Sequence, residues 1–178
     1  MSPRIARVAL AVWLLAIYAT LGVVRPFANY LRDSGWMRIA VASSFALAGA
    51  LMLWVIFRAP RRRSWRTVFT LFGTAVVYAA VILPMDSPEE KIHFIQYGVV
   101  ALLAYESFRR YRVALVFVIA AGWLDEGIQA LLPSRYYDLR DVAFNAAAGA
   151  LALLARYALT HERVGSGRPE DVAENAAR

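Results

Sequence analysis

The sequence predicts an all-α fold: a polytopic membrane helix bundle of about six transmembrane helices, with both termini in the cytoplasm. The 178 residues are 60% hydrophobic, whereas an ordinary soluble domain is roughly 45–50% apolar. The apolar residues also gather in runs of about 17–20 residues, the length that crosses about 30 Å of hydrocarbon. These runs cover residues 8–24, 39–57, 67–83, 88–108, 113–132 and 139–159.

Basic residues between the runs predict the orientation of the bundle. With the N-terminus inside, the cytoplasmic segments hold fourteen of the 20 lysines and arginines, and the external loops hold six. Cytoplasmic loops carry the excess of positive charge in membrane proteins, so we expect both termini in the cytoplasm. The net charge of +7 and the arginine-rich segment 58–66 would also suit nucleic acid. Because that segment lies between two apolar runs, we interpret it as a cytoplasmic loop and expect no nucleic-acid partner.

The N-terminal part, residues 1–85, is predicted to hold the first three spans. A short basic head precedes residues 8–24. This run is long for a signal peptide and has no clear cleavage site, so we expect it to be retained as a span. Residues 25–38, which include Pro26, are expected to form a linker to the second span.

The predicted core of the protein, residues 86–159, begins with a helix-start signature. Ser87 is placed as an N-cap, and Glu90 three residues later completes a capping box. We therefore expect a helix from residue 88 to about 108. Residues 160–178 carry mixed charge and glycine, and we expect them to form a disordered cytoplasmic tail.

Turn and cap residues bound the last two helices of this core. Pro133 is expected to stop the helix over residues 113–132, because proline cannot continue a helix. Asp138, with Asp141 three positions later, offers a second cap. This cap predicts the start of the helix over residues 139–159.

Polar residues form one stripe on each of the last three helices. Residues three and four apart share a helix face, and the starts of the fourth and sixth helices lie on the same side of the membrane as the end of the fifth. We therefore expect the three stripes to converge in one site at the outer surface. The stripes consist of Glu90, His93 and Tyr97, of Gly122, Glu126 and Gln129, and of Asp138, Asp141, Asn145 and Gly149.

The chemistry of these side chains suggests different roles. His93 and Glu126 are the candidate catalytic residues, because burial suits a carboxyl group to exchanging protons with an imidazole. Arginine can hold a phosphate or carboxylate through two hydrogen bonds, which makes Arg135 a candidate anion ligand. Asp125 lies about 100° from Glu126 around its helix and is expected to point elsewhere. The candidate ligand-binding residues are Glu90, Lys91, Gln129, Arg135, Asp138, Asp141 and Asn145.

Two other interpretations of the stripes stay open. In the structural one, the carboxylates cap helix N-termini, Arg135 pairs with an aspartate, and Gln129 and Asn145 bond neighbouring helices. In the other, His93 and nearby carboxylates hold a metal ion, but no compact metal-binding motif is present, so we assign no metal ligands. The chain has no cysteine, which excludes disulfides, thiolate metal sites and cysteine nucleophiles. The residues identify no cofactor.

The same residues resemble two signatures of the VanZ-like membrane proteins. The run Glu90-Lys91-Ile92-His93-Phe94, followed by Tyr97, is similar to the first signature, although the family usually has aspartate in place of Glu90. Ser134 also departs from the family, which often has a glycine before the arginine. The resemblance covers residues 86–159. The second signature is matched by Glu126, Gln129, Pro133, Arg135, Asp138, Asp141, Asn145 and Gly149.

This resemblance implies a multi-span protein of the bacterial inner membrane. The family is named after a member that raises resistance to teicoplanin, and its biochemical activity is not established, so whether this protein is an enzyme stays open. We expect it to bind or modify an envelope lipid or a lipid-linked glycan, with membrane lipid or envelope enzymes as partners. One alternative is a non-catalytic envelope assembly or accessory protein. The other is a small transporter that uses Glu126, Gln129 and Asn145 as a relay.

Overall fold

In the part of the chain that the structure describes, the regular structure is helical and no strand is present, which confirms the all-α prediction. This computed structural model describes residues 1–37, 39, 42–43, 46, 65–85, 88–132 and 137–161. Most of the predicted second span, the arginine-rich segment up to residue 64 and the tail from residue 162 lie outside these residues. The long helices are α1 (Pro3–Asp33), α3 (Trp65–Ile82), α4 (Pro88–Phe108), α5 (Tyr111–Gln129) and α6 (Leu139–His161).

The helix boundaries in the second half of the chain follow the sequence signals. α4 has the predicted bounds, and α5 ends at Gln129, a few residues before the expected stop at Pro133, which is itself outside the described residues. α6 begins at Leu139 as predicted. Its start is fixed by Asp138, whose Oδ1 accepts a hydrogen bond from the backbone N–H of Arg140 at 2.8 Å.

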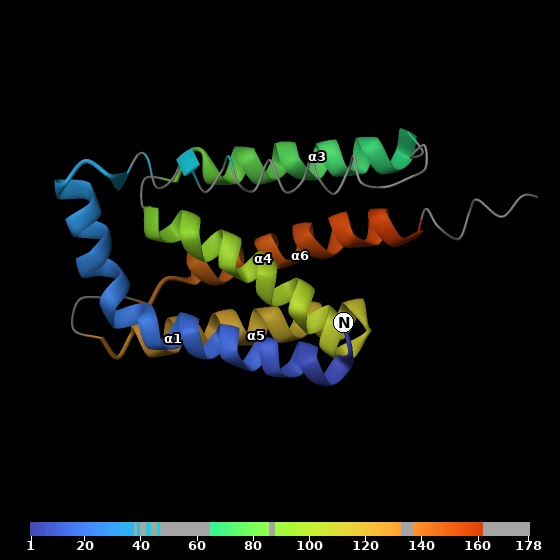
Figure 1. Ribbon diagram of the computed structural model, residues 1–178, viewed down its shortest axis with the longest axis horizontal. Helices are drawn as coiled ribbons and strands as arrows, with labels where there is room; N and C mark the ends of the chain where they lie inside the picture. The colour runs from blue at the N-terminus through green and yellow to red at the C-terminus, as the bar shows by residue number, and fades with distance from the viewer. Residues whose placement is uncertain are drawn as a thin grey trace, which may run out of the picture.

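α4 runs through the middle of the bundle and packs on α1, α5 and α6, while α3 packs on α6 (Figure 1). The ends of α3 and α5 and the starts of α4 and α6 lie together, at the left in Figure 1. We call this the site end of the bundle. The N-terminus and the end of α6 lie at the opposite end. This arrangement places the polar stretches of α4, α5 and α6 side by side.

The prediction that residues 25–38 form a linker is wrong for the first part of that segment, because α1 continues through Pro26 to Asp33. A proline inside a helix removes one backbone hydrogen bond and crowds the preceding turn, so it bends a helix and need not end it. Figure 1 shows α1 changing direction along its length. The chain then turns at Gly35, whose φ of +76° suits a residue without a side chain.

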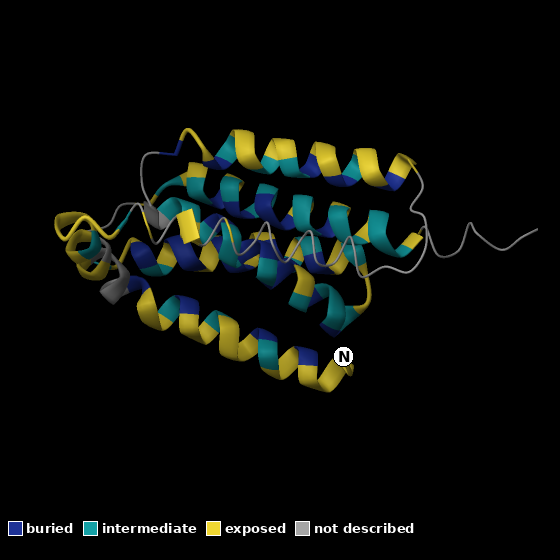
Figure 2. Ribbon diagram, turned by 45° about the horizontal axis from the view of Figure 1, so that its top comes forward, coloured by how far each residue is buried: buried dark blue, intermediate teal, exposed yellow. Residues whose placement is uncertain are grey.

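Among the described residues, three helices are long and apolar enough to cross a membrane: Pro3–Leu21 within α1, and the whole of α3 and α6. α4 and α5 are of similar length but carry more charge: Glu89, Glu90, Lys91 and Glu106 on α4, and Arg112, Asp125 and Glu126 on α5. Large apolar side chains are exposed on α1 and α3, whose outer faces are mostly exposed in Figure 2. An apolar outer surface around a helical core indicates a membrane protein.

α5 and α6 approach closely at Gly149, as its small size predicts. A Cβ atom at this position would lie 2.7 Å from Cγ1 of Val118 on α5, which is inside the contact distance of two carbon atoms. The absence of a side chain therefore sets the distance between these two helices. This packing holds the polar ends of α5 and α6 next to each other.

Candidate functional site

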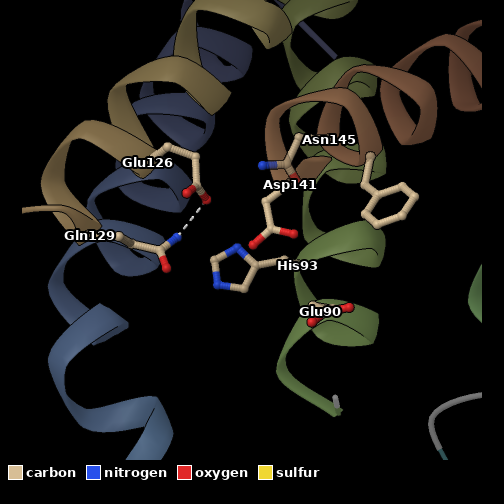
Figure 3. A pocket seen from close by; sticks show the side chains of 7 residues that line it. Glu90, His93, Glu126, Gln129, Asp141 and Asn145 are labelled. Atoms are coloured by element: carbon tan, nitrogen blue, oxygen red, sulfur yellow. Dashed lines mark hydrogen bonds between the residues drawn. The ribbon is translucent and has the colours of Figure 1, made fainter. Parts of the chain in front are cut away.

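A small polar cavity lies at the site end, between α4, α5 and α6. Figure 3 shows that its lining side chains come from all three helices, with the carboxylate of Glu126 and the ring of His93 on different sides of the same space. The cavity volume is about 20 Å³, which is room for one water molecule. The lining residues are Glu90, His93, Glu126, Gln129, Asp141, Phe144 and Asn145.

Glu126 connects the end of α5 to the start of α6. Its side chain is buried, and both carboxylate oxygens accept hydrogen bonds. Oε1 accepts from Nε2 of Gln129 at 3.0 Å, and Oε2 accepts from the backbone N–H of Asp138 at 3.1 Å. The carboxylate thus has a fixed orientation while it lines the cavity.

His93 is oriented by a second carboxylate, that of Asp125. Nδ1 of His93 lies 3.2 Å from Oδ2 of Asp125, and the hydroxyl of Tyr97 donates to the same oxygen at 3.1 Å. The side chain of Asp125 is 0% exposed, and that of His93 is 13% exposed. Because Nδ1 is turned to the carboxylate, Nε2 is the ring nitrogen left for a ligand in the cavity.

Asp125 is the site residue that the sequence interpretation misses. The side chain of Asp125 points in a different direction from that of Glu126, as the 100° spacing requires. Both side chains nevertheless point into the protein interior. α5 packs on α4 as well as on α6, so Asp125 meets α4 and Glu126 meets α6. The available signal is the residue type, since an ionisable side chain in an apolar helix needs a partner. His93 is that partner.

A second tyrosine reaches this region from α1. The hydroxyl of Tyr18 donates to the backbone carbonyl of Ala121 at 3.1 Å, and the Tyr97 hydroxyl shares its single proton between this carbonyl, also at 3.1 Å, and Asp125. Tyr18 therefore attaches the first helix, to which the sequence assigns no site residue, to the helix that carries the two carboxylates. Oδ1 of Asp125 is buried and has no hydrogen-bond partner among the described residues.

Asn145 is buried at the interface of α5 and α6, nearly two turns after the start of α6. A Cβ atom on Gly122 would lie 3.3 Å from Cβ of Asn145 and 3.5 Å from its Nδ2. Gly122 therefore makes room for the amide, as the shared position in the predicted stripes suggests. The amide group lines the deep side of the cavity.

Two of the remaining candidate residues, Asp138 and Lys91, do not line the cavity. Asp138 reaches Glu126 through its backbone N–H, while its side chain caps α6. Lys91 is partly exposed on α4 and does not line the cavity. Arg135 lies outside the described residues, so its role stays a prediction. Among the described residues, no three histidine, aspartate or glutamate side chains are placed to hold a metal ion.

The arrangement can exchange a proton with a group that enters the cavity. An imidazole and a carboxylate face one space, and each is oriented by hydrogen bonds, which is what acid–base chemistry requires. A lipid head group or a sugar is larger than the cavity of about 20 Å³. Such a ligand would therefore present only part of itself to His93 and Glu126.

Compared with known proteins, the chain matches no family model, no curated protein and no solved structure.

Proposed function

We propose that the protein is a VanZ-like integral protein of the bacterial inner membrane that binds or modifies an envelope lipid or a lipid-linked glycan. In this proposal about six helices cross the membrane, both termini are cytoplasmic and the site end faces outward. The distribution of basic residues, fourteen in the cytoplasmic segments and six outside, supports the orientation. The order and spacing of the two polar signatures support the family.

The observation that carries the proposal is the shared cavity of His93 and Glu126. Ionisable side chains in a membrane helix are costly, by about 2.5–3.5 kcal/mol each at a span centre. Helix packing alone needs neither an imidazole nor a carboxylate that faces the same space. Two such groups with fixed orientations are better explained by a polar ligand that they contact.

In this proposal the position of each residue determines its role. His93 and Glu126 bond to the polar head of the ligand or exchange a proton with it, and Asp125 keeps the imidazole in place. Asn145, at the deep side of the cavity, is a further hydrogen-bonding group. Arg135 is proposed to hold a phosphate or carboxylate through a bidentate contact.

Native mass spectrometry of the purified full chain tests this proposal. We expect wild-type protein to retain a lipid or a lipid-linked glycan, and His93→Gln and Glu126→Gln to lose it, because both changes keep a polar side chain of similar size. His161→Gln, an exposed histidine at the opposite end, is the matched control. Retention by both site variants, or a wild-type protein that carries no such ligand, would contradict the proposal.

A non-catalytic assembly or accessory role is the second candidate, and one observation favours it. Glu126 uses both of its oxygens within the protein, so the site also works as a connection between helices. In that case His93→Ala and Glu126→Ala should lower protein abundance and an envelope phenotype in parallel. Loss of the phenotype at normal abundance supports ligand binding instead.

A further inference from the structure

A larger groove opens at the site end, beside the polar cavity. It lies between the end of α3 and the starts of α4 and α6, and its volume is about 530 Å³. Sites for small molecules typically measure roughly 300–1,000 Å³. The charged lining residues are Glu90 and Arg140. The apolar ones are Ala80, Val81, Pro84, Met85 and Phe144.

Tyr78 fixes the α3 wall of this groove against α4. Its hydroxyl donates to the backbone carbonyl of Phe94 at 3.1 Å, and the two rings pack edge to face with centres 4.6 Å apart. Gly98 makes room for this contact, because a Cβ atom there would lie 3.3 Å from the tyrosine hydroxyl. The groove wall begins directly after Tyr78 on the same helix, so the groove has a fixed side.

We propose that this groove binds a lipid phosphate, with the apolar chain along the end of α3 and the phosphate on Arg140. The inference rests on the proposed function and names the class of ligand that the same site takes. The polar remainder of the ligand's head group then lies next to the cavity that contains His93.

Arg140 gives the groove its preference for an anion. Its side chain is exposed, and its guanidinium carbon lies 5.9 Å from the centre of the Phe144 ring. A guanidinium group binds phosphate through two parallel hydrogen bonds. Arg140 also stands in the first turn of α6, where the helix dipole favours negative charge, although its own backbone N–H is already bonded to Oδ1 of Asp138.

Glu90 decides which side of the groove the phosphate occupies. It lines both the groove and the polar cavity, as Phe144 also does. Because two negative charges repel each other, the phosphate stays on the side of Arg140. The uncharged polar part of the head group is then the part that approaches the cavity.

The position of the groove relative to the membrane suits a lipid better than a soluble phosphate ester. α3 ends at Ile82 and α6 begins at Leu139, and both helices are candidate membrane spans. The groove therefore lies where the hydrocarbon meets the head groups. Leu83, next to the groove, is 72% exposed and extends the apolar surface on which a chain can lie. A soluble ester would leave this apolar wall uncovered.

Binding of farnesyl phosphate and of farnesol to the full chain in phosphatidylcholine nanodiscs tests the inference, because the two ligands differ only by the phosphate. We expect wild-type protein to bind farnesyl phosphate at least about tenfold more tightly, as one charge-assisted contact provides. Arg140→Gln should remove this preference, and Arg140→Lys should keep part of it. Arg66→Gln, at the exposed start of α3, should leave it unchanged.

A second variant tests the apolar wall. Ala80→Trp fills the groove from α3 and should weaken both ligands by a similar factor, and inorganic phosphate should compete poorly because it has no chain. Equal affinities for the two ligands in wild-type protein, or an unchanged preference in folded Arg140→Gln, would overturn the inference. If native mass spectrometry then finds a retained neutral lipid or glycan, the proposed function stands without the lipid phosphate.

Discussion

His93 and Asp125 meet inside the bundle, with Nδ1 of the imidazole 3.2 Å from Oδ2 of the carboxylate. Tyr97, one turn after His93 on α4, donates to the same oxygen at 3.1 Å. This carboxylate on α5 therefore fixes the direction of the imidazole ring and attaches α4 to α5. Substitutions at Asp125 affect both the stability of the bundle and the orientation of a candidate catalytic group.

Asp125→Ala should lower the free energy of unfolding by about 1–3 kcal/mol, because it removes the carboxylate partner of the partly buried His93 and one of the two acceptors of the buried Tyr97 hydroxyl. Asp125→Asn should cost less, since its amide oxygen still accepts a hydrogen bond. Denaturant unfolding of the purified protein in detergent measures both. Equal losses in the two variants would show that the acceptor oxygen is not what stabilises the fold.

A double-mutant cycle that combines His93→Ala with Asp125→Ala measures the interaction energy of this pair. Because the two side chains are in contact, the double variant should lose less stability than the sum of the single variants, by about 0.5–3 kcal/mol. His161→Ala combined with Asp125→Ala is the control and should be additive, since His161 lies at the opposite end of α6. Additive losses in the first pair would contradict the contact.

Gly149→Ala should destabilise the bundle by about 1–3 kcal/mol through overpacking. The added Cβ atom would lie 2.7 Å from Cγ1 of Val118, so Val118→Ala in the same chain should restore part of the loss. Gly73→Ala on α3 is the matched control, because a Cβ atom there has nothing within 4 Å. Thermal unfolding that does not distinguish Gly149→Ala from Gly73→Ala would rule out the close approach of α5 and α6.

The fold is predictable from the sequence where a local signal marks a boundary. The predicted starts of α4 and α6 agree with the structure, and in α6 the cap is the hydrogen bond that Asp138 accepts within the first turn; Ser87, the predicted cap of α4, lies outside the described residues. Pro26 is a weaker signal, since a proline is compatible with the end of a helix and with a bend inside one. Neighbouring structure decides between the two, and in α1 the helix continues.

The part of the site that follows from helical spacing is predictable from the sequence. Spacing places Glu126 and Asn145 on facing stripes, and the order of the helices brings them to the same end as His93. Helical spacing gives the direction of the Asp125 side chain only relative to that of Glu126. The packing of α4 on α5 determines which side chain Asp125 contacts. The same limit applies to Arg140. The sequence identifies it only as a basic residue near a span, whereas the groove that it lines is formed by the packing of α3, α4 and α6.

Glu126→Gln should separate the structural role of this side chain from its charge. The amide oxygen can still accept from the backbone N–H of Asp138, so stability should fall by no more than about 1 kcal/mol, while retention of the ligand is lost. Glu126→Ala should lose ligand and about 1–3 kcal/mol of stability together. Unfolding and native mass spectrometry on the same preparations give both values. A Glu126→Gln protein that keeps its ligand would remove the carboxylate from the proposed chemistry.

Glu106 holds the opposite end of the bundle together. Its Oε2 lies 2.8 Å from Nη2 of Arg109, and its Oε1 lies 2.6 Å from Nη2 of Arg156 on α6. Arg109 also donates to the backbone carbonyl of Met1 at 2.8 Å, so one carboxylate connects α4, α6 and the N-terminus.

Glu106→Gln should therefore lower the free energy of unfolding by about 1.5 kcal/mol, the lower end of the range for hydrogen bonds to charged groups, because the side chain of Glu106 is partly exposed. High salt should reduce the difference from wild type, since salt screens the ion pairs of the wild-type protein. Retention of the ligand at the site end should not change. Unfolding at two salt concentrations and native mass spectrometry test both statements. Loss of the ligand from folded Glu106→Gln protein would show instead that the two ends of the bundle are coupled.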